Sequence, residues 1–401
     1  MERAELARRL GAAHAGSFTG PHRIDEADPH HFMAAFSRAA AGEGDVFLCD
    51  PAWRESERAQ MASLGGDARC GERGWLMIPT GGSGGIVRFA RHDAATIAAA
   101  VGGFCRHFGR ERVNSVGVLP LHHVSGFMAW MRSALTGGTY IPWSWKEAQA
   151  GRFPGGQPAD CFVSLVPTQL QALLRTEAGV AWLRRFQVIF LGGAPAWDAL
   201  LDEAARLALP LSLGYGSTET AAMAAALTPE QFLGGARGCG TAMPHASIAV
   251  AGGLVQVAGD SVFRGYYPES RAERTWISGD LGSIDAAGNL TILGRADDVV
   301  ITGGEKVFPS EVEAALKASG QFEDAVVIGL KDDRWGQVVV ACHPAGKGAF
   351  DAASVNASLA SLAAYKRPKH YVAVEPWPRT PQGKVDRAAL SLLARARVEP
   401  A

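Results

Sequence analysis

The sequence predicts an α/β protein. Its large N-terminal domain combines parallel βα layers with a small β-barrel-like subdomain, and a small α+β C-terminal domain follows. From about residue 75 to residue 215, short apolar runs alternate with segments of helical period, which is typical of a parallel sheet covered by helices on both faces. After about residue 240, short alternating runs between glycine turns replace the helices, which indicates a small barrel or a curled sheet.

The βα alternation can be followed element by element. The expected order of strands and helices is LMIP, DAATIAAAVGGFCRHF, SVGVLPL, FMAWMRSAL, CFVSLVP, TQLQALLRT, QVIFLGG, AWDALLDEAARLA and LPLSLGYG. A third pattern begins near residue 297 with DDVVITGG, PSEVEAALKASG, DAVVIGL, QVVVACHP, DAASVNASLASLAAY and HYVAVE. We therefore place the N-terminal domain at 1–296 and the C-terminal domain at 297–401, with a charged joint between two apolar strands.

Composition favours small-molecule partners. The 401 residues include 47% hydrophobic residues, and 39 lysines and arginines balance 40 acidic residues, so no net field would attract nucleic acid or a membrane surface. Six scattered cysteines show neither zinc spacing nor a disulfide framework. No run of eighteen apolar residues and no apolar signal region is present. A cytoplasmic enzyme without membrane insertion is expected.

A glycine-rich loop follows the first of these strands. It consists of Thr80, Gly81, Gly82, Ser83, Gly84 and Gly85. Successive small residues let backbone N–H groups converge on an anion, but the loop fits neither the P-loop of NTPases nor the dinucleotide-binding fingerprint. A plain hairpin between LMIP and IVRFA explains it equally well.

Four further segments carry polar chemistry. Glycines precede a helix in LGGAPAW (191–197), and GYGSTET (214–220) offers an aromatic ring, hydroxyls and a carboxylate suited to Mg²⁺. SGD (278–280) with GRADD (294–298) supplies a carboxylate for ribose hydroxyls and a guanidinium, and TPQGKVDR (380–387) places a lysine on a turn. Taken singly, these could be a strand-to-helix turn, a capping box, a surface ion pair and a solvated loop lysine.

Together, in this order, the five segments resemble the adenylate-forming superfamily of acyl- and aryl-CoA synthetases, luciferases and peptide-synthetase adenylation domains. The similarity covers residues 75 to 390. The superfamily's phosphate loop, T-S-G-T-T-G-x-P-K-G, aligns with Thr80 onward, so that Val87 replaces the proline and Arg88 the lysine. The motifs GGAP, Y-G-x-T-E, S/T-G-D, G-R-x-D-D and P-x-G-K-x-x-R are nearly intact.

The resemblance implies an enzyme that uses ATP, Mg²⁺ and CoA. It assigns the nucleotide to the phosphate loop and Arg88, to Gly193, Ala194 and Pro195, to Tyr215, Gly216, Ser217 and Thr218, and to Asp280 and Arg295. Glu219 would bind Mg²⁺, and Lys384 would promote adenylation by contacting the acid and the α-phosphate. The C-terminal domain would swing about a hinge at Asp297 and bring Gly304 to the CoA channel.

The segment PLHHVSG (120–126) bears on the identity of the acid substrate. It aligns with the position of the superfamily's gate beside the acyl pocket. His123 would be the gate, with His122 and Ser125 as further acyl-site candidates. This segment and the loop are most similar to those of the o-succinylbenzoate:CoA ligases of menaquinone and phylloquinone synthesis, particularly a short variant. Another aryl- or acyl-CoA synthetase, an enzyme loading a carrier protein, and a silent nucleotide-binding relative are the alternatives. A homodimer is compatible with the sequence, which does not specify the oligomeric state.

Overall fold

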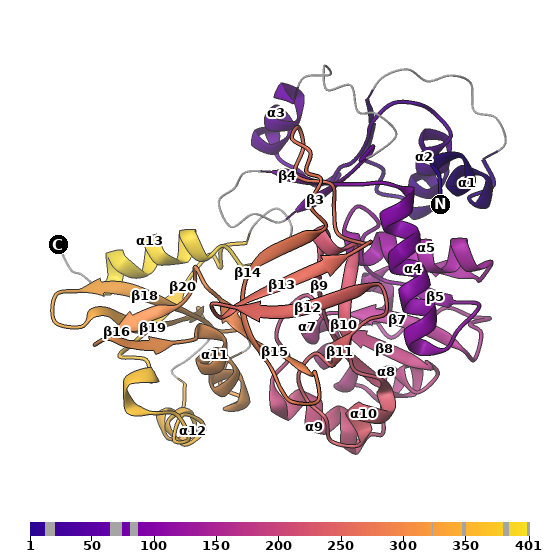
Figure 1. The fold of residues 1–401 in the computed structure, drawn as a ribbon. Helices are drawn as coiled ribbons and strands as arrows, with labels where there is room; N and C mark the ends of the chain where they lie inside the picture. The colour runs from indigo at the N-terminus through magenta and orange to yellow at the C-terminus, as the bar shows by residue number, and fades with distance from the viewer. Residues whose placement is uncertain are drawn as a thin grey trace.

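Four sheets and the helices around them form the protein in the computed structural model (Figure 1). The structure describes residues 1–12, 21–64, 74–80, 87–322, 324–346, 350–379 and 385–398. The α/β class and the large N-terminal part followed by a smaller α+β unit are confirmed. Among the described helices, none combines the length and the apolar composition that crossing a membrane requires.

The N-terminal sheet has the order β1-β2-β3-β4, with β1 to β3 parallel and β4 antiparallel to β3. Its strands are β1 (His22–Ile24), β2 (Val46–Leu48), β3 (Leu76–Thr80) and β4 (Arg88–His92), and its helices are α1 (Arg3–Arg9), α2 (Pro29–Ala40) and α3 (Glu55–Ser63). The sequence pattern placed LMIP at the start of the main parallel sheet, whereas β3 lies in this separate sheet. Strands β1 and β2 were not predicted, because three residues are too short to show a period.

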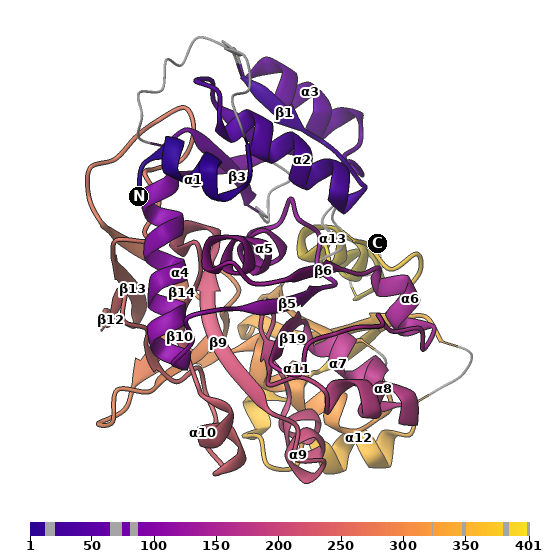
Figure 2. The same ribbon diagram turned by 90° about the vertical axis from the view of Figure 1, so that its right-hand side faces the viewer.

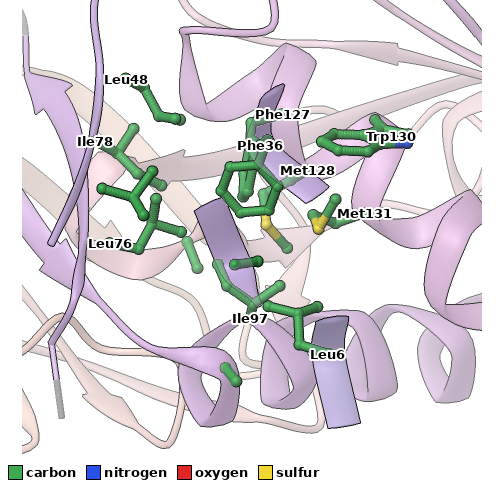
Figure 3. Packing of buried hydrophobic residues seen from close by; sticks show 14 of the residues in the cluster. Leu6, Phe36, Leu48, Leu76, Ile78, Ile97, Phe127, Met128, Trp130 and Met131 are labelled. Carbon is green, nitrogen blue, oxygen red and sulfur yellow. The ribbon is translucent and has the colours of Figure 1, made fainter. Parts of the chain in front are cut away.

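A shared core joins this sheet to the next layer (Figure 3). Phe36 of α2 packs edge-on against Phe127, with ring centroids 4.9 Å apart, and lies 5.5 Å from the ring of Trp130. Both partners belong to α5 (Val124–Thr136), which Figure 2 shows between the N-terminal helices and the strands of the central sheet. The core therefore fixes the start of α5 relative to the N-terminal sheet.

The central sheet has seven strands in the order β11-β10-β9-β8-β7-β5-β6. They are β5 (Asn114–Gly117), β6 (Tyr140–Pro142), β7 (Cys161–Leu165), β8 (Val188–Leu191), β9 (Leu211–Ser217), β10 (Ala222–Ala226) and β11 (Thr241–Ala242). Strands β5 to β9 are parallel, and β10 and β11 run antiparallel. Because parallel strands bury both faces, helices cover each side of this sheet.

Two groups of helices cover the central sheet. Phe104 of α4 (Ala94–Phe108) packs against Phe162 and Phe190 on one face, which α5 also covers. The other face packs against α6 (Trp145–Gln149), α7 (Pro167–Leu174), α8 (Glu177–Leu183), α9 (Asp198–Arg206) and α10 (Pro229–Leu233). The segments after β5, β7, β8 and β9 consequently meet at one edge of the sheet, where ligands bind in open α/β sheets.

The subdomain after residue 240 is an open antiparallel sheet rather than a closed barrel, with the order β12-β13-β14-β15. Its strands are β12 (Ala246–Ala251), β13 (Leu254–Gly259), β14 (Thr275–Ile284) and β15 (Leu290–Arg295). Of the two expected forms, the curled sheet is therefore the one adopted.

The C-terminal unit contains one mixed sheet and three helices. Its elements are β16 (Val300–Thr302), β17 (Glu305–Val307), α11 (Pro309–Ala318), β18 (Val326–Asp332), β19 (Gly336–Pro344), α12 (Ala352–Ser358), β20 (His370–Val374) and α13 (Arg387–Val398). The Ser310 hydroxyl donates to the Leu293 carbonyl at 2.8 Å, and Lys317 Nζ lies 5.7 Å from the Trp197 ring centroid. These contacts seat α11 against β15 and α9.

Candidate active site

The glycine-rich loop connects two paired strands. Thr80 ends β3 and pairs with Arg88 at the start of β4, so the strands of the expected hairpin are present, while Gly81, Gly82, Ser83, Gly84 and Gly85 lie outside the described residues. Thr80 is buried, and its hydroxyl has no hydrogen-bond partner among the described residues. The exposed Arg88 guanidinium lies 4.8 Å from the centroid of the Tyr266 ring.

The turn after β9 presents the Y-G-S-T-E segment. A Cβ at Gly216 would overlap the carbonyl oxygen of Ala222, so this position needs glycine. The Ser217 N–H donates to Thr220 Oγ1 at 2.9 Å, a version of the capping box that was the alternative interpretation. Ala221 and Ala222 follow with φ of 53° and 77°, which is strained for alanine and is often associated with functional sites.

His92 stabilises this turn through a hydrogen bond to its backbone. Its side chain is completely buried at the end of β4, and Nε2 lies 2.8 Å from the carbonyl oxygen of Thr218. Burial lowers the pKa of His92 to about 4, so the imidazole is neutral near pH 7 and Nε2–H donates to that carbonyl. His92 therefore positions Thr218, a role that the sequence analysis missed.

Glu219 is held by two contacts. Its Oε1 accepts a hydrogen bond from the Tyr266 hydroxyl at 2.6 Å, and its backbone carbonyl accepts one from the Phe263 N–H at 2.8 Å. The second carboxylate oxygen accepts none from a described side chain. A buried carboxylate with one oxygen fixed and one available fits a Mg²⁺ ligand.

Tyr215, Asp280 and Arg295 converge from three strands. The Tyr215 hydroxyl donates to Asp280 Oδ2 at 2.7 Å, and Arg295 Nη1 lies 3.5 Å from Asp280 Oδ1. Arg295 also donates from Nε and Nη2 to both oxygens of Asp297, each at 3.0 Å. This bidentate pair raises the pKa of Arg295 and lowers that of Asp297. The side chains of Tyr215, Asp280, Arg295 and Asp297 thus form one network, although they lie up to 82 positions apart in the sequence.

The GGAP segment forms an exposed surface beside this network. Gly193, Ala194 and Pro195 are exposed after β8. Gly193 has a φ of 79°, which favours glycine, and only Val166 lies within 4 Å of where its Cβ would be. Since β8 and β9 are neighbours in the sheet, the segment lies at the same edge of the sheet as the turn after Tyr215.

The histidines before α5 contact a residue of the N-terminal sheet. His122 is buried, and its Nε2 lies 3.5 Å from Oδ1 of Asp50, which follows β2. The His122 and His123 rings lie 4.5 Å apart, and Ser125 is half-buried in the first turn of α5. Asp50 was not predicted, because 72 residues separate it from His122.

Arg132 is a buried charge that the sequence analysis also missed. Among the described residues, its Nε has no hydrogen-bond partner, and no carboxylate forms an ion pair with it. The guanidinium carbon lies 4.3 Å from the Phe104 ring centroid and 5.7 Å from that of Phe190. Burial lowers its pKa to about 10, so it remains a cation near pH 7.

A narrow gap, with no room for a water molecule, lies beside this guanidinium. It is lined by Phe104, Ser115, Val116, Ala129, Arg132, Phe162, Val163, Ser164 and Phe190. Ser125, Ala129 and Arg132 follow the i, i+4, i+7 spacing of one helix face. The gap therefore lies along the face of α5 whose first turn contains Ser125.

Gly304 lies in the turn between β16 and β17 with a φ of 86°. Next to it, the Gly303 N–H donates to the Trp335 carbonyl at 2.8 Å. Trp335 is 37% exposed, and its ring centroid lies 4.2 Å from Lys369 Nζ and 4.9 Å from the Arg334 guanidinium carbon. Lys384 lies outside the described residues. The adjoining Arg387 spans Asp298 and Glu313, with Nε 3.4 Å from Asp298 Oδ2 and Nη2 donating to Glu313 Oε1 at 2.6 Å.

Comparison with known proteins places this geometry in a family. The AMP-binding enzyme family matches residues 70–267, and the AMP-binding enzyme C-terminal domain matches residues 311–384. A 2-succinylbenzoate–CoA ligase of Listeria monocytogenes serotype 4b is 31% identical over 281 residues, which cover 68% of this chain and 60% of the relative. The chain thus spans about 60% of the length of the Listeria relatives that it matches.

Two further relatives extend over nearly the whole chain. A protein of Mycobacterium tuberculosis strain CDC 1551, named a probable 2-succinylbenzoate–CoA ligase, is 30% identical over 390 residues, or 89% of this chain and 94% of its own. The o-succinylbenzoate CoA synthetase of Bacillus subtilis in complex with its acyl-adenylate intermediate superposes with a TM-score of 0.80 at 21% identity, covering 97% of this chain and 91% of that one. The chain belongs to the AMP-binding, adenylate-forming enzyme family.

Proposed function

We propose that this protein is an ATP-dependent acid:CoA ligase that makes o-succinylbenzoyl-CoA through an acyl-adenylate. The observation that carries the choice of acid is Arg132, a buried guanidinium without a carboxylate partner in the described part of the chain. The names of the curated relatives support the same substrate.

The charge at Arg132 suits an acid with a second carboxylate. An unpaired buried charge is costly, and a substrate carboxylate would supply the missing counter-ion. Phe104 and Phe190 are buried and pack on the guanidinium, so the acid would reach Arg132 only when these rings move apart. While one carboxylate of o-succinylbenzoate reacts near His123, the other would pair with Arg132. A monocarboxylic aryl acid, the main alternative substrate, would leave this cation unpaired.

The nucleotide would bind along the edge formed by the turns after β8 and β9. Asp280 and Arg295 would bind ribose hydroxyls, and the exposed Gly193–Pro195 segment and Tyr215 would contact adenine. Thr218 would donate to the α-phosphate, and the phosphate loop with Arg88 would contact the rest of the triphosphate. Glu219 would hold Mg²⁺, which neutralises phosphate charge when bound.

The chemistry follows in two steps. A carboxylate oxygen of the acid attacks the α-phosphorus, forming an acyl-adenylate and releasing pyrophosphate. The CoA sulfur then attacks the acyl carbon, and AMP leaves. Lys384 is proposed to stabilise the negative charge that develops on the pentacoordinate phosphorus in the first step.

Two features of the C-terminal unit support CoA as the acceptor. Trp335 offers an exposed aromatic face, and Lys369 and Arg334 place two cations at that ring. Such a surface suits a base with adjacent phosphates, which CoA has and a carrier-protein arm lacks. Because Trp335 contacts Gly303, it would accompany Gly304 toward the acyl-adenylate.

We further propose that the protein divides into domains 1–296 and 297–401, with a hinge at Asp297. The Arg295–Asp297 pair crosses this boundary, whereas the Asp298–Arg387 contact lies within the C-terminal domain. A rotation between the half-reactions would have to rearrange the Arg295–Asp297 pair.

The test of the function is direct. Purified protein with ATP, Mg²⁺ and CoA should convert o-succinylbenzoate to its CoA thioester and release AMP and pyrophosphate, as measured by mass spectrometry and pyrophosphate detection. Failure with o-succinylbenzoate but turnover of another aryl or fatty acid would show that the substrate is wrong. Activity with a carrier protein but not with free CoA would show that the acceptor is wrong.

Lys384→Ala separates the two steps. We expect it to abolish pyrophosphate release from ATP and acid, because the developing charge loses its counter-ion, yet to leave thioester formation from supplied acyl-adenylate nearly intact. Equal loss in both steps would contradict the proposed role.

A further inference from the structure

A group of side chains unrelated to the nucleotide lies where the N-terminal sheet meets α5. Asp50 follows β2, and His122 and His123 form the turn before α5. Each residue offers one ligand atom, and the three atoms lie within 4.8 Å of one another. Within the described ranges, no other trio of His, Cys, Asp or Glu side chains meets this condition.

The distance between His122 and Asp50 matches that between two ligands of one ion. His122 Nε2 lies 3.5 Å from Asp50 Oδ1, beyond the usual range for an N–H···O bond of about 2.7–3.2 Å. Two ligands of one tetrahedral zinc ion, each about 2.0–2.1 Å from the metal, lie about 3.3 Å apart. The two imidazole rings are inclined at 51°, so they are not stacked face to face.

The backbone holds these residues in place. Asp50 Oδ1 accepts the Ala52 N–H at 2.8 Å. The His123 N–H donates to the Pro120 carbonyl at 3.2 Å, and the His123 carbonyl accepts the Phe127 N–H at 2.9 Å. These hydrogen bonds orient the Asp50 carboxylate and the turn that contains the two histidines.

We propose that Asp50, His122 and His123 form a binding site for one divalent transition-metal ion such as Zn²⁺. Imidazole and carboxylate groups are established zinc ligands, whereas Mg²⁺ prefers oxygen ligands and retains water. Three protein ligands leave a fourth position for water or a ligand carboxylate. The ion would connect the N-terminal sheet to α5 and so stabilise the folded chain.

The test uses the full, tag-free chain after metal removal, titrated with Zn²⁺ by calorimetry in millimolar Mg²⁺. We expect one site per chain and a higher midpoint of thermal unfolding with Zn²⁺. Asp50→Asn and His122→Gln should each weaken binding by more than the 10- to 100-fold typical of losing an outer-shell group. The matched control is His30→Gln/His31→Gln, which removes an exposed histidine pair on α2 and should leave binding unchanged.

Cobalt substitution keeps the proposal testable if a variant fails to fold. Co²⁺ bound to the unaltered protein should give d–d bands without a thiolate charge-transfer band. Zinc binding that survives both substitutions, that is lost in the His30/His31 control, or that shows cysteine ligation would overturn the site. None of these measurements needs acid, ATP or CoA, so their outcome is independent of the proposed ligase activity.

Discussion

The nucleotide side and the acid side of the candidate active site differ in how their charges are satisfied. On the nucleotide side, Asp280 already binds Tyr215 and Arg295, and Glu219 already binds Tyr266. On the acid side, Arg132 is buried among aromatic rings without a carboxylate partner in the described structure. Under the proposed function, the protein positions groups for ATP in advance, but leaves one cation to be paired by the acid.

Replacing the unpaired cation should have the largest effect. In Arg132→Met, kcat/KM for o-succinylbenzoate should fall at least about 30-fold, because losing one partner of a buried charge pair costs about 2–5 kcal/mol. The free energy of unfolding without ligand should rise by about 1 kcal/mol or more, because a desolvated charge is removed. Steady-state kinetics and urea denaturation measure the two quantities.

The control for this variant is Arg106→Met on the exposed side of α4. It should change the free energy of unfolding by less than about 0.5 kcal/mol. If Arg132→Met is less stable than the parent, the guanidinium has a structural partner. The contrast drawn between the nucleotide side and the acid side would then be wrong.

The second prediction concerns the nucleotide side. Tyr266→Phe removes the hydrogen bond to Glu219 and should lower kcat/KM for MgATP about 10-fold, since hydrogen bonds to charged groups contribute about 1.5–3 kcal/mol. The KM for the acid should stay unchanged. An effect on the acid KM with normal use of MgATP would place Tyr266 on the other side of the site.

The third prediction uses the pH dependence of stability to test the hydrogen bond between His92 and the Thr218 carbonyl. Burial lowers the pKa of His92 and of His245 from 6.5 to about 4. Between pH 6.5 and pH 4 the unfolded chain binds more protons than the folded chain. The stability that the two neutral histidines contribute is therefore complete above pH 6.5 and is lost as the pH falls toward 4. Each residue contributes up to about 3 kcal/mol to this loss.

His92→Gln keeps an N–H donor for the Thr218 carbonyl but does not titrate. Denaturation curves from pH 7 to pH 4 should therefore show a shallower loss of stability than the parent, and His92→Gln/His245→Gln a shallower loss still. An unchanged slope would contradict the assignment of a buried, neutral His92.

The smallest effect is expected at Arg88. Arg88→Ala removes a cation from the exposed face of Tyr266, a contact that contributes about 0.5–1 kcal/mol at such sites. The KM for ATP should rise about 2- to 5-fold. A loss as large as that of Lys384→Ala would mean that Arg88 contacts the reacting phosphate itself.

The sequence predicted residues that lie in motifs better than residues that act through packing. Tyr215, Asp280 and Arg295, whose side chains meet in the structure, could be singled out because strand ends and glycine turns mark them. Arg132 could not be recognised, because an arginine in an amphipathic helix normally faces solvent and only the tertiary packing buries this one.

The same limit applies to the other residues that were missed. His92 ends a strand whose sequence shows no signal of the contact with Thr218, 126 residues later. Asp50 lies in a region whose strands are too short to show a periodic pattern in the sequence. The roles of Lys384 and of the glycine loop stay predictions from the resemblance alone.

The central claim is that Arg132 pairs with the second carboxylate of the acid. The most direct measurement compares kcat/KM for o-succinylbenzoate and for 4-oxo-4-phenylbutanoate, which lacks the ring carboxylate, in the parent protein and in Arg132→Met. We predict that the parent prefers o-succinylbenzoate at least about 30-fold and that the variant loses this preference, with little change toward the monocarboxylate. An equal loss for both acids would contradict the account.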